Sequence, residues 1–376
     1  MPQGFIITKW TDDQGMLVEF KYPDDIEVDL DDMMRVFYAH VVGAGSSGNV
    51  LVRLEKAHSN VSSHFTGMTG GTPYLVNLML ELGEDPDMFG EAIIKEINEN
   101  ILEYLHGMEE DINKKYAITE KLRGYLKSAL FLFERLKNMS KEQRISQIYS
   151  SAKSRAILEI LQERAHSRRE LQNILEDKIG AIVSNIEYAL DPFIKTNLIK
   201  QDWIEGLSDV FLFLLNDFSL YRKPVKRLVE NARKDLPNAA LAKKYRDAVK
   251  NFFSTYKPTT EDSARIALNM LHPDKYDFIT LFRERAYPMN KLPKTPADSY
   301  LDLDVLLKSL EEDNIIKIIK DDISKIDWVF LFTDISVNIF YPEYLLENIR
   351  SDRAAGTLKK EVAVKHLEFL EEVYTK

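Results

Sequence analysis

Glu230-Asn231-x-Arg233-x-Asp235 recurs 117 positions later as Glu347-Asn348-x-Arg350-x-Asp352, and the likeness extends in both directions along the chain. Residues 197–252 align with residues 314–369 without a gap, and 15 of these 56 positions are identical. A repeat of this length indicates one structural unit that is used twice. Such an organisation favours a scaffold over an enzyme.

The composition is that of a folded protein, because 45% of the 376 residues are apolar and 29% are charged. No run of 18 apolar residues is present that would cross a bilayer, and Met1-Pro2-Gln3-Gly4 does not open an export signal. We therefore expect a cytoplasmic protein without a transmembrane segment. The absence of cysteine excludes disulfides, a thiolate nucleophile and cysteine-ligated zinc, and it fits a reducing compartment.

The net charge of −10 is unevenly distributed along the chain. Residues 1–139 hold 13 Lys and Arg against 23 Asp and Glu, residues 140–258 hold 21 against 15, and residues 259–376 hold 16 against 22. Only the middle third is basic. The changes of sign coincide with changes in hydrophobic pattern, so we predict three domains with these bounds.

The first third alternates between strand-like and helix-like patterns. Apolar residues at helical spacing predict a helix from Leu30 to Val41 and two more that contain Phe89–Leu105 and Leu122–Leu136. The strands are predicted at Phe5–Trp10, Met16–Tyr22, Val50–Leu54, Val61–Thr66 and Pro73–Glu81. The predicted order is therefore β-β-α-β-β-β-α-α.

This order, over about residues 4–138, resembles the longin and roadblock-like domains. The resemblance implies an antiparallel sheet with helices. It also implies a role in membrane-traffic or small-GTPase complexes, through pairing with another longin-like sheet or through binding of a GTPase. A dimer is one form that such pairing would take. No catalytic residue is implied, and no arginine finger can be transferred.

From residue 150 the pattern changes to three helices and a hairpin, which resembles a winged helix. Gly180 separates the second and third helices, and the hairpin strands are predicted at Leu198–Trp203 and Val210–Leu215. In the second copy, Arg265, Leu268 and Leu271 take the places of Arg155, Leu158 and Leu161 at an offset of 110, which a Pro-rich loop lengthens to 117. A closing helix begins near Lys226 and near Glu343. The predicted class is α+β, with a longin-like sheet followed by two tandem winged helices.

Three kinds of chemical site lack the sequence context that each of them requires. Gly43-Ala44-Gly45-Ser46-Ser47-Gly48 matches a dinucleotide loop, but that loop must follow a strand and open a helix, and here the order is reversed. The seven histidines show no metal-binding spacing, and no serine lies in a nucleophile elbow. We predict no enzyme activity and no cofactor, metal or catalytic residue. A nucleotide-binding enzyme built on the glycine loop is the weakest alternative.

Winged helices often place their third helix in the major groove of DNA. In the first copy this helix, about Ala181–Thr196, carries Glu187 and Asp191 against Lys195. In the second copy, residues 301–313 carry five acidic residues against Lys308. Acidic helices disfavour nucleic acid, because affinity for DNA comes from neutralising phosphates.

A positive face on the first winged helix is the remaining candidate for nucleic-acid backbone, acidic lipid or an acidic protein. It could also be a solvated surface that balances the acidic first domain. The residues of this face are Arg164, Arg168, Arg169, Arg222, Lys223, Lys226 and Arg227.

Two continuous apolar runs, 211–215 and 328–332, predict strands that are covered on both faces. Trp328, Phe330 and Phe332 are therefore candidates for an interface, although packing within the chain is the favoured single explanation. The Glu-Asn-x-Arg-x-Asp repeat would form ion pairs on a helix surface, use its Asn and Asp for local hydrogen bonds, or offer a repeated docking surface.

The expected function is that of a non-enzymatic adaptor. Tandem winged helices resemble endosomal-sorting subunits, and a longin domain joined to a winged helix resembles the nitrogen-permease-regulator-like subunits that act on small GTPases. We therefore expect protein partners, such as a small GTPase or another longin-like subunit. The alternative is a transcription-related protein that binds DNA through the basic face of the first winged helix.

Overall fold

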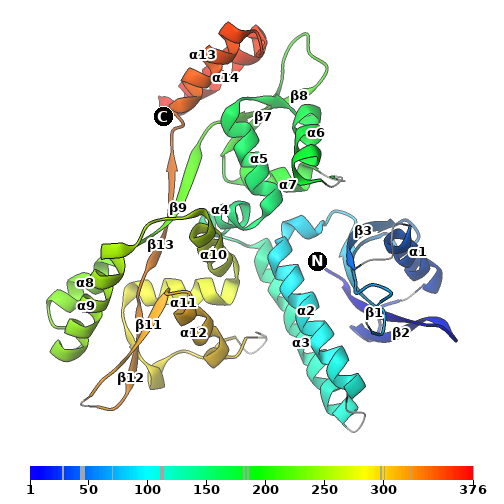
Figure 1. The fold of residues 1–376 in the computed structure, drawn as a ribbon, viewed down its shortest axis with the longest axis horizontal. Coiled ribbons are helices and arrows are strands. Elements are labelled where there is room, and N and C mark those ends of the chain that lie inside the picture. The colour runs from blue at the N-terminus through cyan, green and yellow to red at the C-terminus, as the bar shows by residue number, and fades with distance from the viewer. Residues whose placement is uncertain are drawn as a thin grey trace. The chain divides into compact units, whose positions relative to one another are not determined.

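The computed structural model describes residues 1–27, 29–42, 47–69, 71–110, 114–180, 183, 186–296, 299, 301–322 and 324–375. They form two compact units (Figure 1). The first unit comprises Met1–Asn138 with Thr295–Asp302, and the second comprises Met139–Lys294 with Leu303–Lys376. In the described residues, no helix has the length and apolar character needed to span a membrane.

The first unit contains a five-stranded antiparallel sheet with the order β2-β1-β5-β4-β3. Its central strands are buried along most of their length, which is the pattern of a sheet that is covered on both faces. The strands are β1 (Gly4–Thr11), β2 (Gly15–Tyr22), β3 (Gly48–Leu54), β4 (Ser59–Phe65) and β5 (Tyr74–Glu81).

Helices cover the two faces of this sheet. α1 (Leu30–Val41) packs Phe37 against Ile6 and Phe65 on one face. On the other face lies Phe5, whose ring centroid is 6.4 Å from that of Phe133 in α3 (Lys115–Lys137). A 3₁₀ helix, η1 (Pro86–Met88), and α2 (Glu91–Glu110) precede α3. The predicted order of strands and helices is confirmed.

The second unit begins with α4 (Lys141–Ser150) and the first copy of the repeat. The Ser167 hydroxyl accepts a hydrogen bond from the backbone N–H of Glu170 and so starts α6 in a capping box. Gly180, with φ +67°, ends that helix in the left-handed conformation that glycine favours. The elements of this copy are α5 (Ala152–Glu163), β6 (His166–Ser167), α6 (Arg168–Ile179), α7 (Ile186–Lys195), β7 (Ile199–Trp203) and β8 (Val210–Leu214), and its sheet order is β6-β8-β7.

The second copy has the same order of elements, except that a single 3₁₀ turn takes the place of α6. Its sheet order, β10-β12-β11, is also equivalent. The elements are α11 (Pro273–Glu284), β10 (Tyr287–Pro288), η3 (Met289–Lys291), α12 (Leu303–Glu312), β11 (Ile316–Lys320) and β12 (Asp327–Leu331), and α10 (Thr260–Leu271) precedes them as α4 precedes the first copy.

The register of the sheets corrects the predicted alignment of the first helices. His166 pairs with Leu212, and Tyr287 pairs with Val329, so β10 is equivalent to β6 at an offset of 121. The helix that precedes β10 is α11, which makes α11 the equivalent of α5. The predicted offset of 110 was therefore wrong, since Arg265, Leu268 and Leu271 lie in α10, the counterpart of α4. The offset falls from 121 to 117 because the second copy is shorter after its first strand.

The strands β9 (Asp217–Lys223) and β13 (Asp334–Phe340) pair with each other and not with the sheets of their own copies. This two-stranded antiparallel ribbon pairs Leu220 with Val337. These two residues are equivalent in the repeat, since they lie 117 positions apart. The ribbon is thus crossed at its middle by a local pseudo-twofold axis that relates the two copies.

Each copy passes its closing helices across the ribbon to the other copy (Figure 1). α8 (Lys226–Arg233) and α9 (Ala239–Thr255) follow β9, and Tyr245 of α9 stacks on Phe330 of the second copy with ring centroids 4.8 Å apart. α13 (Tyr344–Ala355) and α14 (Lys360–Tyr374) follow β13, and the Phe369 ring lies 5.2 Å from that of Phe213 in the first copy. The copies therefore exchange their C-terminal helix pairs.

The exchange explains the two continuous apolar runs. The backbone oxygen of Leu331 accepts a hydrogen bond from the Tyr245 hydroxyl at 2.9 Å, and the oxygen of the equivalent Leu214 is 2.9 Å from Nε2 of His366. The middle strand of each sheet is thus covered on its second face by helices of the other copy. The prediction that these strands are covered on both faces is confirmed, and the cover comes from the chain itself.

Candidate protein-docking grooves

Two surface grooves lie at equivalent places in the two copies. The Trp groove, in the second copy, has a volume of about 470 Å³, and the Phe groove, in the first, has a volume of about 330 Å³. The lining of the Trp groove includes Leu236, Arg285, Tyr287, Lys291 and Trp328. The lining of the Phe groove includes Arg164, His166, Glu170, Phe211 and Leu358.

The floors of the grooves come from corresponding residues. Glu163-Arg164-Ala165-His166 ends α5 and enters β6, and Glu284-Arg285-Ala286-Tyr287 does the same for α11 and β10. Phe211 of β8 and Trp328 of β12 pair with the short strands at the same register position. This short repeat at an offset of 121 was present in the sequence, and it would have identified both grooves had the offset been recognised.

The opposite wall of each groove comes from the other copy. The connection between α8 and α9 supplies Leu236 and Pro237 to the Trp groove, and the connection between α13 and α14 supplies Thr357 and Leu358 to the Phe groove. Neither groove would have this wall without the exchange of helices. The grooves are therefore products of the paired architecture and not of a single copy.

The lining of the Phe groove carries charges of both signs. A guanidinium nitrogen of Arg164 lies 3.9 Å from the Asp352 carboxylate, which α13 contributes. The Glu170 carboxylate accepts a hydrogen bond from the backbone N–H of Ser167 at 3.0 Å, as part of the capping box. One of the two cations that line this groove, Arg164, thus has an acidic neighbour within the protein, and the other is Lys359.

The Trp groove has lost both of these acidic features. The equivalent of Asp352 is Asp235, which lies 3.9 Å from Arg246 of α9, and the equivalent of Glu170 is Lys291. Arg285 lies over the ring of Tyr287, 4.7 Å from its centroid. Among the described residues, Arg285 and Lys291 line the groove without an acidic lining residue. The two grooves have one architecture, but of the two only the Phe groove has a carboxylate among the described residues of its lining.

The apolar candidates from the sequence divide between this groove and the core. Trp328 is half-buried, and it lines the Trp groove together with Phe330, which is itself buried. Phe332 is buried, and its ring centroid lies 5.2 Å from that of Phe252 in α9. Of these three residues, only Trp328 presents a partly exposed aromatic surface to the groove.

The seven basic candidates lie on three parts of the second unit. Arg164, Arg168 and Arg169 are near the junction of α5 and α6, Arg222 and Lys223 are in β9, and Lys226 and Arg227 are in α8. Arg168 pairs with Glu187 at 2.7 Å, and Arg227 pairs with Glu284. Arg169 and Lys226 are exposed. Whether these residues contact a partner stays a prediction.

Arg222 has a structural role at the base of the ribbon. It is buried, its Nη2 lies 2.8 Å from Oδ1 of Asp262, and its Nη1 donates to the Thr333 hydroxyl at 2.9 Å. Burial alone would raise the pKa of Asp262, but the hydrogen bonds from Arg222 and Tyr256 outweigh it and hold that pKa below its usual value. The equivalent position in the second copy is Ile339, so this ion pair occurs in one copy only.

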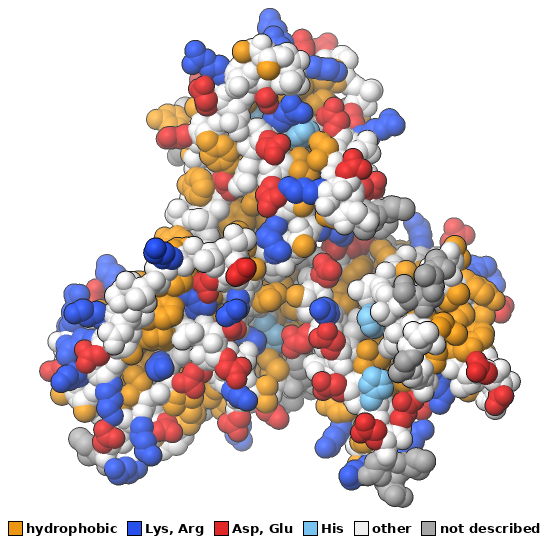
Figure 2. All heavy atoms as spheres, in the orientation of Figure 1, with side chains coloured by type: hydrophobic (Ala, Val, Ile, Leu, Met, Phe, Trp, Pro, Cys, Tyr) orange, Lys and Arg blue, Asp and Glu red, His pale blue; other side chains and the backbone are white. Residues whose placement is uncertain are grey.

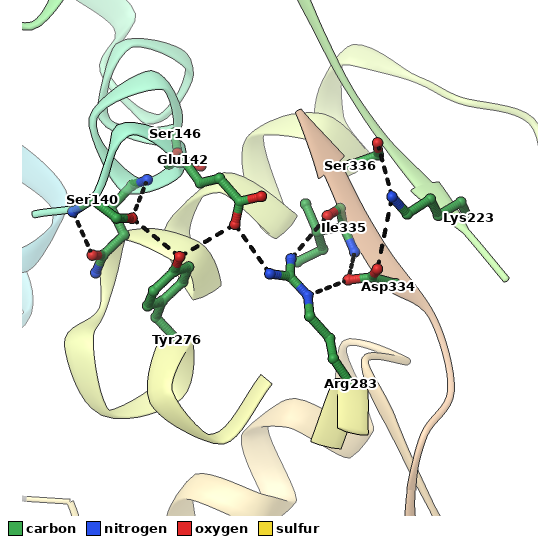
Figure 3. A network of polar contacts seen from close by, with 10 residues as sticks. Ser140, Glu142, Ser146, Lys223, Tyr276, Arg283, Asp334, Ile335 and Ser336 are labelled. Carbon is green, nitrogen blue, oxygen red and sulfur yellow. Dashed lines mark hydrogen bonds and ion pairs between the residues drawn. The ribbon is translucent and has the colours of Figure 1, made fainter. Parts of the chain in front are cut away.

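A network around Arg283 ties α4 and α11 to the ribbon (Figure 3). Arg283 donates to Asp334 at 2.8 Å and to Glu142 at 3.1 Å, and the Tyr276 hydroxyl links Glu142 to Ser140. The equivalent contact in the first copy runs from Gln162 to Asp217 at 2.9 Å. Because each group has its partner within the chain, the network fixes the ribbon.

The glycine loop and the histidines were the other sequence candidates for a chemical site. Residues 43–46 of the glycine loop lie outside the described residues, but the described flanks show a helix that ends at Val41 and a strand that begins at Gly48. This order is the opposite of that in a dinucleotide loop. Among the described residues, no group of His, Asp and Glu is placed to hold a metal ion.

Two further surfaces carry exposed side chains of interest. α1 of the first unit exposes Leu30, Tyr38 and Val42, and hydrophobic side chains gather in this part of the surface (Figure 2). In the second unit, α7 and α12 are the third helices of the two copies. Asp191 of α7 pairs with Lys195 at 2.7 Å, whereas α12 exposes Asp304 and Val305.

Comparison with models of protein families, with curated proteins and with solved structures gave no match for this chain.

Proposed function

We propose that the protein is a non-enzymatic adaptor that holds protein partners in a small-GTPase or membrane-trafficking complex. In this proposal the first unit is a longin-like domain and the second contains two tandem winged helices. The sheet order β2-β1-β5-β4-β3 and the repeated order of helices, short strand and hairpin support these assignments.

The observation that carries the proposal is the pair of equivalent grooves. Each has its floor in one copy and its wall in the exchanged helices of the other. Grooves that combine an aromatic surface with a few charged groups are the form in which proteins hold the side chains of a peptide. The two copies support each other through their exchanged helices, and each carries one such groove. This arrangement is suited to holding two segments of partner proteins at a fixed separation.

The link to GTPases or to membrane traffic rests on the first unit. Its α1 presents Leu30, Tyr38 and Val42 to solvent, with 51%, 56% and 87% of their surfaces exposed. Apolar residues that lie together on one helix face indicate a contact surface. The partner proposed for this face is a small GTPase or a second longin-like subunit.

Binding of DNA is the second candidate, and the helices α8 and α9 favour it. Their exposed surface carries Lys226, Arg227, Lys243, Lys244 and Lys250. Figure 2 shows basic side chains over these helices, with acidic ones among them. The third helices would contribute little, because α12 exposes Asp304 and Glu312. An electrophoretic shift that weakens steeply with salt would support this candidate.

Affinity purification of the full chain from its native cell, followed by mass spectrometry, tests the proposal. We expect enrichment of a small GTPase, a longin-like protein or sorting subunits over an untagged control. The variant Tyr38→Asp, which places a charge on the exposed face of α1, should lose the partner of the first unit only. Recovery of RNA polymerase or of DNA-bound complexes, with no partner of the expected kinds, would contradict the adaptor function.

A further inference from the structure

We infer that the Trp groove binds a short acidic peptide segment that carries an apolar anchor side chain, and that the Phe groove does not. This inference rests on the proposed adaptor function and names the chemistry of one partner. It is carried by the difference between two grooves of the same architecture.

The anchor would enter the apolar part of the Trp groove. Trp328 is half-buried and supplies an aromatic surface, and Leu236 and Pro237 face it from the exchanged helix pair. Large aromatic side chains in partly desolvated pockets contribute most of the energy in peptide recognition. The volume of about 470 Å³ is within the range of pockets that take small ligands or side chains.

The acidic residues would flank the anchor. Arg285 and Lys291 are exposed at the groove, and Asp235, the residue that would neutralise Arg285 by analogy with the first copy, lies beside Arg246. Two cations at the edge of an apolar groove favour carboxylates on either side of an apolar residue. Nucleic acid fits less well, because its affinity depends on many neutralised phosphates, and this groove offers two cations around an apolar floor.

The Phe groove is the internal control. Arg164 has Asp352 as its acidic neighbour, Glu170 takes the place of Lys291, and the remaining cation of the lining is Lys359. An acidic peptide would have to displace Asp352 and would then meet the Glu170 carboxylate. The same fold in the same chain therefore predicts binding in one groove and exclusion from the other.

The test measures fluorescence anisotropy of a fluorescein-labelled peptide, Glu-Asp-Phe-Glu-Asp, with the full chain. Lys291→Glu gives the Trp groove the carboxylate that the Phe groove has at the equivalent position, and we expect it to weaken binding by about tenfold, or roughly 1.4 kcal/mol. Arg285→Gln should weaken binding by a similar factor. Glu170→Lys should leave the affinity within about twofold, because Arg164 keeps its acidic neighbour. All three side chains are exposed, and urea unfolding would verify that each variant is folded.

Peptide controls define the chemistry. A Lys-Lys-Phe-Lys-Lys peptide should not bind, and replacing Phe by Ala in the acidic peptide should remove most of the affinity. The inference is overturned if the acidic peptide fails to bind, if Lys291→Glu binds it as well as the natural chain does, or if Glu170→Lys weakens it equally. It is also overturned if a DNA duplex binds more tightly than the peptide and depends on Lys291.

The adaptor proposal can fail separately. If Lys291→Glu abolishes peptide binding while the natural chain recovers no partner from cells, the groove chemistry stands and the adaptor function falls. If partners are recovered and Lys291→Glu retains all of them and still binds the peptide, the adaptor function stands and the assignment of the Trp groove falls.

Discussion

The two copies of the repeat use different side chains for the same structural task. In the second copy, the carbonyl of Leu331 and the ring of Phe330 are covered by Tyr245, and in the first, the equivalent Leu214 and Phe213 are covered by His366 and Phe369. Tyr245 is equivalent to Val362, so the two contacts come from helical positions about one turn apart. In both copies, a helix from the other copy makes a polar contact with the equivalent backbone carbonyl, but the side chain that makes this contact differs. The following predictions test how far this difference extends.

Loss of the Tyr245 side chain should give the largest effect. Tyr245→Ala removes a fully buried ring that stacks on Phe330, and we expect a loss of about 4 kcal/mol in the free energy of unfolding, measured by urea denaturation. Tyr245→Phe keeps the ring and removes the hydrogen bond to Leu331, so it should cost about 1 kcal/mol. If the two variants lose equal amounts of unfolding free energy, the ring of Tyr245 does not stabilise the second copy.

The ion pair of Arg222 is present in one copy only and should be next in size. Arg222→Met leaves Asp262 without its guanidinium, and we expect a loss of about 3 kcal/mol in the same assay. The double variant Arg222→Met, Asp262→Leu should regain part of this stability, because no carboxylate is then left unpaired. Ile339→Met, at the equivalent position, should change stability by less than about 1 kcal/mol. If Arg222→Met alone also lowers the unfolding free energy by less than about 1 kcal/mol, the ion pair does not stabilise the ribbon.

The pH dependence of the unfolding free energy should distinguish the two exchanged helix pairs. His366 of α14 titrates, whereas Tyr245 of α9 does not titrate below neutral pH. Burial lowers the pKa of His366 below its usual value of 6.5, despite its contact with the Leu214 carbonyl. The unfolded chain then binds the proton more readily, so the stability from the neutral imidazole is present above pH 6.5 and is lost as the pH falls below that value. His366→Gln keeps a donor without titrating, and its unfolding free energy should fall less between pH 7.5 and pH 5.5. Parallel curves for the two proteins would contradict this role.

The shared Asn of the Glu-Asn-x-Arg-x-Asp repeat should show the smallest difference. The Asn348 amide donates hydrogen bonds to the backbone oxygens of Gln162 and Glu163 at 3.1 Å. These bonds provide partners for carbonyls at the C-terminal end of α5, which have none within the helix. Asn348→Ala should cost about 1 kcal/mol. Asn231, which lines the Trp groove, makes no equivalent contact among the described residues, and Asn231→Ala should cost less than about 0.5 kcal/mol. A larger loss of stability for Asn231→Ala than for Asn348→Ala would show that the repeat stabilises the fold through Asn231.

The sequence alone was enough for the elements of the first unit, because its strands and helices have distinct periodicities and strong turns. It also indicated that residues 211–215 and 328–332 are covered on both faces. It did not indicate what covers them, because a strand pattern does not specify which helix lies above it. The exchange of helices depends on contacts between residues more than 80 positions apart, such as Tyr245 with Leu331, and no local pattern encodes these.

The grooves were missed for a related reason. The repeat that begins at residue 197 has an offset of 117, whereas Arg164 and Arg285 are equivalent at an offset of 121, so an alignment at a single offset does not pair them. Trp328 was identified from its apolar run, and it is a groove residue. Arg222 was grouped with surface cations because sequence shows a charge but not its burial. Asn197 and Asn314 are identical in the copies because both adopt a positive φ, 58° and 55°, that asparagine tolerates.

The reciprocal exchange of helix pairs is the central claim, and engineered cysteines test it most directly because the natural chain has none. Nζ of Lys244 in α9 lies 2.6 Å from the carboxylate of Asp322 in the second copy, and Glu205 is the equivalent of Asp322 in the first. With a short bismaleimide, Lys244→Cys paired with Asp322→Cys should cross-link efficiently within one chain, whereas Lys244→Cys paired with Glu205→Cys should not. Efficient linkage to position 205 and none to position 322 would show that each copy keeps its own helices and would contradict the exchange.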